Sequence, residues 1–234
     1  MIHLRPEIFT LAPNFHRGLV IASSLSNTGE SPELQKLLEK AEAETKTLEN
    51  PILLPSVTAW DEVHRSFGSN PNKFSPAHKN LLKRVHRPDG RLPFISRVVA
   101  IMNIASLRLQ TPVGGDDLDR MLSFGPNLEL RLAEGDESFL PLGKEAKEES
   151  PEHGEVIYVS GETVMCRRWN WRNSGQTLIT PETSRMIMNI DCLGENAAGL
   201  AREGAELVGS LLEEFCGAKV EHHLLHANEP RLTL

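Results

Sequence analysis

The seven residues from Cys166 to Arg172 read CRRWNWR and hold two tryptophans and three arginines. Guanidinium groups bind phosphate and indole rings stack on nucleobases, so this composition is typical of contact with a nucleotide. In an extended strand the side chains alternate between two faces. One face then carries Arg168, Asn170 and Arg172, and the other carries Arg167, Trp169 and Trp171. The alternative is that the tryptophans fill the core while the arginines pair with acidic segments of the chain.

A second candidate site follows the apolar helix that the sequence predicts over residues 97–109. Asn103 is the polar residue at its centre, and Gly114 and Gly115 come shortly after Pro112 ends the helix. A buried asparagine needs partners for its amide, and glycine permits backbone conformations that other residues resist. Two aspartates come next. The pattern predicts the wall of a binding site, and the plainer interpretation is a core helix followed by a tight turn.

Basic residues gather in one stretch of a chain whose formal net charge is -7. Residues 73–108 hold eight lysines and arginines against one acidic residue, whereas residues 129–155 hold nine carboxylates against three basic residues. Lys79, Lys83 and Arg84 are expected on the outer face of a helix that begins near Ser75. A basic segment of this kind can dock a phosphate backbone. A solvated helix surface without a partner is the alternative.

The cysteines and histidines give weaker indications. The three cysteines are odd in number and far apart, which favours reduced thiols over a disulfide framework or a zinc site. His222, His223 and His226 would face one metal ion only if they lay on a helix, and a polar tail is the simpler expectation. We therefore expect no metal and no cofactor.

Missing motifs exclude several classes of enzyme. The sequence has no P-loop, no G-x-G-x-x-G and no G-x-S-x-G elbow, so it predicts neither ATP-dependent chemistry nor an α/β-hydrolase. No apolar run approaches the ~20 residues of a membrane span, and the N-terminus lacks the layout of a signal peptide. A cytoplasmic protein is expected.

The elements that must position these residues follow the apolar pattern. Helices are predicted at residues 31–49, 58–67, 97–109 and 194–216, with a further helix starting at residue 75. Strands are predicted at residues 17–26, 127–133, 138–142, 155–159, 163–168, 185–192 and 219–225, with an exposed loop at 143–154. The simplest organisation is one domain over residues 1–234, whose core spans about 75–192.

The stretch RLPFISRVVAIMNIASLRLQTPVGGDDLD, residues 91–119, resembles the core of the B3/B4 domain of the bacterial phenylalanyl-tRNA synthetase β subunit. In that domain a proline turn leads into an N-x-V-V-D-x-x-N-Y-V helix, which L-G-Q-P and H-A-F-D-x-D segments follow. The residues in step with it are Val98, Val99, Asn103, Leu109, Pro112, Asp117 and Asp119. The resemblance implies an α+β, B3/B4-like fold with a mixed or antiparallel sheet and flanking helices.

The task that the resemblance implies is editing, in which the ester joining a wrong amino acid to the terminal ribose of tRNA is hydrolysed. Such hydrolysis needs an oriented water and donors for the oxyanion. The implied catalytic set is Asn103, Gly114, Gly115, Thr180 and Thr183. The implied set that binds the aminoacylated tRNA is Lys79, Lys83, Arg84, Arg97, Arg167, Arg168, Trp169, Asn170, Trp171 and Arg172.

Two departures bear on the substrate. Gly114 stands where the synthetase domain has a histidine, and its G-G-E run is absent, with Asn173 to Gly175 nearby instead. These departures put the synthetase's substrate, tyrosine attached to phenylalanine tRNA, in doubt. Three hypotheses remain open: a deacylase acting on mischarged tRNA, a tRNA- or RNA-binding module without chemistry, and a protein that binds a free amino acid.

Overall fold

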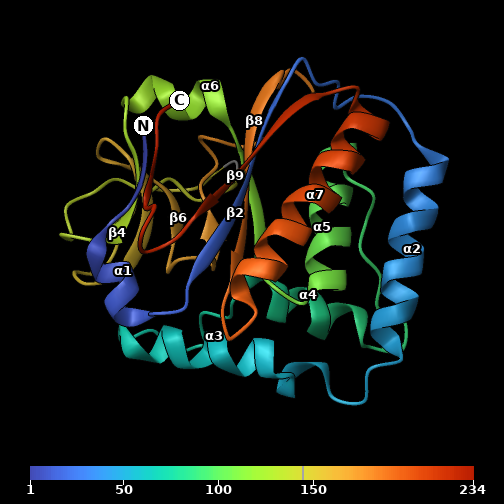
Figure 1. The fold of residues 1–234 in the computed structure, drawn as a ribbon, viewed down its shortest axis with the longest axis horizontal. Coiled ribbons are helices and arrows are strands. Elements are labelled where there is room, and N and C mark those ends of the chain that lie inside the picture. Colours follow the sequence, from blue (N-terminus) through green and yellow to red (C-terminus); the bar gives the residue numbers. More distant parts are fainter. Residues whose placement is uncertain (144) are drawn as a thin grey trace.

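Two β-sheets and a group of helices form three layers in the computed structural model, which describes residues 1–143 and 145–234 (Figure 1). A four-stranded sheet lies in the middle, a six-stranded sheet covers one of its faces, and the helices cover the other. This is the α+β architecture with mixed and antiparallel sheets that the sequence predicts. Lys144, within the predicted loop at 143–154, lies outside the described residues.

The four-stranded sheet is antiparallel throughout and has the order β3-β8-β2-β9. Its strands are β2 (His16–Ser23), β3 (Val113–Asp117), β8 (Arg185–Cys192) and β9 (Lys219–Leu225). Successive side chains alternate between the two faces. Apolar side chains such as Met188 face the helices, while Arg17, Asn189 and Asp191 belong to the opposite face, where they line a cavity.

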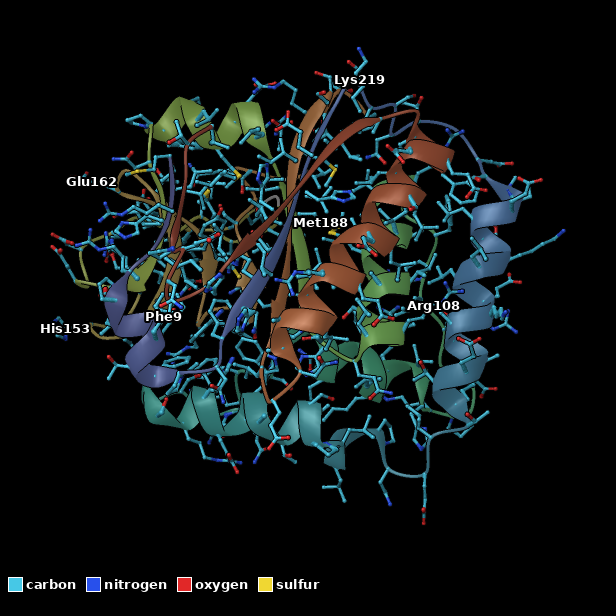
Figure 2. All side chains as sticks on the ribbon, in the orientation of Figure 1. Phe9, Arg108, His153, Glu162, Met188 and Lys219 are labelled. Carbon is cyan, nitrogen blue, oxygen red and sulfur yellow. The ribbon has the colours of Figure 1, made fainter. Side chains whose placement is uncertain are left out.

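The helical layer is built from α2 (Pro32–Lys46), α4 (Ala77–Val85), α5 (Arg97–Leu109) and α7 (Ala197–Cys216). The Ser96 hydroxyl accepts a hydrogen bond from the Val99 amide and so caps α5 just before residue 97, where the sequence predicts the helix to begin. Helix α7 lies directly on β2, at a position where a Cβ on Gly18 would collide with the Ala201 carbonyl oxygen. Met188, labelled in Figure 2, is fully buried between the sheet and these helices.

The six-stranded sheet has the order β10-β1-β4-β5-β6-β7. Its strands are β1 (Ile2–Leu4), β4 (Leu128–Leu132), β5 (Val156–Ser160), β6 (Thr163–Arg167), β7 (Arg172–Asn173) and β10 (Arg231–Leu232). β1 pairs parallel with β4 and antiparallel with β10, so the two chain ends lie together (Figure 1). Around the sheets lie α1 (Pro6–Leu11), the 3-10 helix η1 (Pro51–Leu53), α3 (Pro55–Ser66) and α6 (Leu118–Phe124).

Several predicted elements differ from the structure. Gly114 and Gly115 lie in strand β3, paired with Asn189 and Met188, and not in a tight turn. Residues 138–142 form only isolated bridges, because their partners are single residues of loops and strand ends. The strand predicted at residues 219–225 is confirmed as β9, so His222 and His223 lie in a strand and not in a polar tail. Strands β1 and β10 and helices α1 and α6 are short elements that the apolar periodicity did not reveal.

Within residues 1–143 and 145–234, no helix is both long enough and apolar enough to cross a bilayer. The three cysteines are free and buried.

Candidate functional site

A cavity of about 290 Å³ lies between the two sheets. Its floor comes from the polar face of the four-stranded sheet, with Tyr158 and Cys166 of the other sheet opposite. The lining residues on helices α4 and α5, together with Trp171 and Asn173 after β6, are half-buried or exposed, whereas most of those on the sheets are buried. We therefore place the entrance of the cavity between these two helices and the segment that follows β6. The lining residues used below are Arg17, Leu81, Met102, Asn103, Gly114, Asp116, Tyr158, Cys166, Trp169, Asn170, Trp171, Asn173, Asn189 and Asp191.

A buried ion pair forms part of the floor. Arg17 donates from Nε to Asp191 Oδ1 at 2.7 Å and from Nη2 to Oδ2 at 3.0 Å. The Trp169 indole also donates to Asp191 Oδ2, at 3.1 Å. Burial opposes the charge on Arg17, but the attraction of Asp191 outweighs it and raises the pKa of the guanidinium. The carboxylate of Asp191 thus already accepts hydrogen bonds from Arg17 and Trp169. Nη1 of Arg17, in contrast, has no hydrogen-bond partner among the described residues.

Asp116 is the titratable group of the cavity whose pKa lies near neutrality. Its side chain is 3% exposed, and its carboxylate accepts a hydrogen bond from the Thr177 hydroxyl at 2.6 Å. Burial raises the pKa of Asp116 to about 7, although the Thr177 hydrogen bond and the charge of Arg17 act in the opposite direction. A carboxyl group with this pKa takes up and releases protons at neutral pH, as general acid–base chemistry requires.

Asp116 was not among the residues that the sequence proposed for catalysis. The sequence could have indicated Asp116 through its spacing from Gly114. The two residues are two positions apart in β3 and therefore lie on one face of the strand. A Cβ added to Gly114 would meet no heavy atom within 4 Å, so the strand is open to the cavity at this point. Gly115 faces the other way, where a Cβ would meet the Ile187 carbonyl oxygen at 3.1 Å. Gly115 is therefore next to the cavity but does not line it.

Asn103 lines the cavity. It was predicted to be buried, but in the structure it is half-buried. No hydrogen bond engages its amide among the described residues, so the group is available to a ligand. Thr180 and Thr183 lie outside the cavity. The Thr183 hydroxyl donates to Asp117 Oδ2 at 2.6 Å and accepts from the Thr180 amide at 2.9 Å, which holds a turn together. These contacts give both threonines a structural role.

The segment after β6 is a strained turn and not the extended strand that the sequence predicts beyond Arg167. Arg168 and Trp169 have φ angles of 47° and 66°, a left-handed conformation that costs about 1–3 kcal/mol for each non-glycine residue. The Trp169 amide donates to the Val156 carbonyl at 2.7 Å, and the Arg168 amide donates to Glu155 Oε1 at 3.0 Å. The turn brings Trp169, Asn170 and Trp171 to the cavity together, which strict alternation would not.

The arginines of this segment make ion pairs with acidic residues. Arg167 binds Glu155 through two hydrogen bonds of 2.9 and 2.8 Å and is 7% exposed. Arg168 is 3% exposed and lies 3.0 Å from Glu152. Both arginines thus follow the alternative interpretation, in which the arginines pair with acidic segments. Arg172 keeps 40% of its side chain exposed and lies 3.7 Å from Glu149.

The basic stretch is only partly on the surface. Lys79 was expected to point outward, but it is 4% exposed and binds Asp61 of α3 at 2.6 Å. Arg97 donates to the Phe215 and Glu30 carbonyl oxygens and so ties α5 to the end of α7. Lys83 is half-buried. The basic residues of this stretch that remain exposed are Lys73, Arg84, Arg87 and Arg91.

No group of three or more metal-binding side chains occurs among residues 1–143 and 145–234.

Comparison with known proteins gives one family. A family model described as B3/4 domain matches residues 59–205, a range that includes every lining residue named above except Arg17. A crystal structure of an N-terminal fragment of the phenylalanyl-tRNA synthetase β subunit from Pyrococcus horikoshii is similar to this chain, with 10% sequence identity and a TM-score of 0.46. The similarity covers 94% of this chain and 50% of that one. No curated protein matches the chain.

Proposed function

The chain belongs to the B3/4 domain family, and we propose that it binds tRNA and hydrolyses the ester bond of mischarged aminoacyl-tRNA. The observation that supports hydrolysis is Asp116, a buried carboxyl group with a pKa of about 7 on the wall of an open cavity. The pKa of an effective general base lies near the working pH.

The reaction would proceed through one water molecule. Ionised Asp116 accepts a proton from the water as its oxygen bonds to the ester carbonyl carbon. The half-buried Asn103 amide of α5 also lines the cavity and can donate to the developing oxyanion. When the bond between the carbonyl carbon and the ribose oxygen breaks, Asp116 returns the proton to that oxygen. The products are a free amino acid and a tRNA with a free terminal hydroxyl.

The cavity suits an aminoacyl group. Its volume of about 290 Å³ takes an amino acid, and its walls combine apolar Leu81 and Met102 with the polar groups of Tyr158 and Asn189. The Tyr158 hydroxyl and Asn189 Oδ1 have no hydrogen-bond partner among the described residues. A buried polar group without a partner is costly. A ligand that forms hydrogen bonds with these two groups therefore gains affinity.

We propose that the exposed end of α4 and the segment after it contact phosphates of the RNA. Leu81 lines the cavity, and Arg84 lies three residues further along the helix, so the two share a face. Arg87 and Arg91 follow in the exposed segment after the helix. Changing Arg84, Arg87 and Arg91 to Ala should weaken binding of full-length tRNA and flatten its salt dependence. Changing Lys36, Lys40 and Lys46 of α2 removes the same charge from a surface away from the cavity and serves as the control.

The decisive experiment is single-turnover deacylation with a panel of mischarged tRNAs. Asp116→Asn should lower the rate on the best substrate by about 10²–10⁴-fold. In the wild type the rate should rise with pH through about 7, because only ionised Asp116 accepts the proton. Asp119→Asn makes the same chemical change on α6, where the carboxylate is 53% exposed and binds Arg185, and should leave the rate unchanged.

Two outcomes would contradict the proposal. If no charged tRNA of the panel is hydrolysed, the chain is not a deacylase of this kind, and retention of tRNA would then indicate a binding module. If Asp116→Asn folds normally and hydrolyses at the wild-type rate, Asp116 is not the base.

A second candidate function is binding of a free amino acid. Arg17 Nη1 has no partner among the described residues, and a carboxyl group lies in the same cavity. A guanidinium and a carboxylate complement the carboxylate and ammonium groups of an amino acid. Calorimetric titration with the standard amino acids separates this candidate from the first, since it requires binding without RNA.

A further inference from the structure

The three tryptophans differ in exposure. Trp60 and Trp169 are 1% and 2% exposed and pack with Phe15 in the core. Trp171 is half-buried and lines the cavity together with Leu81 of α4 and the exposed Asn173. Its indole therefore lies at the rim of the cavity, where one part of the ring packs on protein and the rest is open.

The Trp171 ring is held in place from several sides. Its backbone amide donates to the Arg167 carbonyl at 3.1 Å, and its ring meets Phe74 in an edge contact with the centroids 4.7 Å apart. The neighbouring Asn170 carbonyl accepts from the Ala77 amide at 3.0 Å, which joins the turn to the start of α4. A flat side chain that is already ordered loses little entropy when a ligand stacks on it.

Positive charge lies beside this ring. The Arg172 and Arg167 guanidinium groups lie over the Trp171 ring at 5.8 and 5.9 Å from its centroid, near the outer limit of a cation–π contact. Lys73 is exposed, with its Nζ 4.9 Å from the centroid of Phe74. An aromatic platform bordered by cations is the arrangement with which proteins hold a single-stranded nucleotide.

We propose that Trp171 stacks the 3′-terminal nucleobase of the acylated RNA, with Arg172 and Lys73 beside the neighbouring phosphates. This inference rests on the proposed function, since an acyl group inside the cavity leaves its ribose at the entrance and the attached base at the rim. Stacking on an indole is tolerant of sequence. The substrate class is therefore any RNA whose 3′ end carries the acyl group, down to a short oligonucleotide.

The kinetic test uses Trp171→Leu and Trp171→Phe with two substrates that carry the same amino acid. One is full-length aminoacyl-tRNA and the other is the 3′-aminoacyl trinucleotide of the tRNA end. Trp171→Leu should lower kcat/KM by about 5- to 150-fold on both substrates, mainly through KM. Trp171→Phe keeps an aromatic face, so its kcat/KM should fall much less than that of Trp171→Leu. Thermal melts show whether each variant is folded.

A second readout does not depend on hydrolysis. AMP and the uncharged trinucleotide should quench the tryptophan fluorescence of the wild type. Trp171→Phe should abolish the quenching even though Trp60 and Trp169 remain. The inference fails if quenching persists in Trp171→Phe, or if Trp171→Leu hydrolyses both substrates like the wild type. A wild type that is quenched but hydrolyses no ester supports the stacking platform and overturns the proposed hydrolysis.

Discussion

The two faces of the four-stranded sheet are made from alternate residues of the same strands, yet they differ in chemistry. The face toward the helices carries hydrocarbon side chains, among them Val20, Met188 and Ile190, all 0% exposed. The face toward the other sheet carries Arg17 and Asp191 where the cavity lies. Side chains on the first face need only to fill space. Those on the second face need specific partners, because a buried charge is stable only when it is paired.

The largest effect is expected from breaking the pair on the cavity face. Asp191→Ala should destabilise the protein by roughly 3–5 kcal/mol, because Arg17 would remain buried without a counter-charge. Urea denaturation measures the change. Replacing both residues, as Arg17→Met with Asp191→Leu, should restore part of the stability, since the buried Trp169 indole would still lack its acceptor. If Asp191→Ala lost less than about 1 kcal/mol of stability, the cavity face would not depend on paired charges, and the contrast between the two faces would fail.

The apolar face should respond through lost volume. Met188→Ala is expected to cost roughly 2–5 kcal/mol, since the side chain is fully buried in the core between the sheet and the helices. The rate per folded molecule should not change, because Met188 does not line the cavity. Denaturation together with single-turnover assays at low temperature separates the two quantities. A loss of activity without a loss of stability would contradict the division between the faces.

Asp116 should make stability depend on pH. Its pKa is about 7 in the folded protein against an ordinary 3.8, so between these values the folded state holds a proton that the unfolded state has released. Stability from this group therefore falls as the pH rises from about 4 to about 7, by up to about 4 kcal/mol. Asp116→Asn removes the dependence and should be more stable than the wild type at pH 8. If the wild type and Asp116→Asn had equal melting curves at pH 8, the ionised Asp116 carboxylate would not destabilise the folded protein, which would contradict its raised pKa.

The smallest effect on stability is expected at Gly114. A side chain at this position meets open space, so Gly114→His should change the free energy of unfolding by less than about 1 kcal/mol. The imidazole would instead occupy part of the cavity and lower the rate on the native substrate, with Gly114→Ala intermediate. Deacylation rates and thermal melts measured side by side test this. Wild-type rates in Gly114→His would place the acyl group elsewhere.

Local signals were sufficient for elements that the chain specifies by itself. The predicted helix at residues 97–109 has the observed bounds, because Ser96 caps one end and the apolar run continues to Leu109. Strand β8 was predicted with its observed ends because its side chains are apolar on one face and mixed on the other. Asn103, Gly114 and Trp171 were proposed from their residue types and line one cavity.

The remaining features depend on contacts between distant residues. Asp61 precedes Lys79 by 18 positions and buries it, although the charge pattern of α4 alone favours an exposed lysine. The local sequence of the glycine pair indicates a turn. The pair lies in a strand because it pairs with β8, which is more than 70 residues later in the chain. Arg168 and Trp169 adopt a left-handed conformation although neither is a glycine, so the sequence does not indicate it. Hydrogen bonds to Glu155 and Val156 stabilise this conformation.

Strand β2 has a consequence for dissecting the chain. It lies between β8 and β9, supplies Arg17 to the cavity floor, and comes from outside the segment at residues 59–205 that matches the family. A fragment limited to that segment would lose a central strand and expose the edge of β8. It would also leave Asp191 without its cation. The matched segment is therefore not a portable module, and grafts or deletions that aim to keep the cavity must carry the N-terminal strand with them.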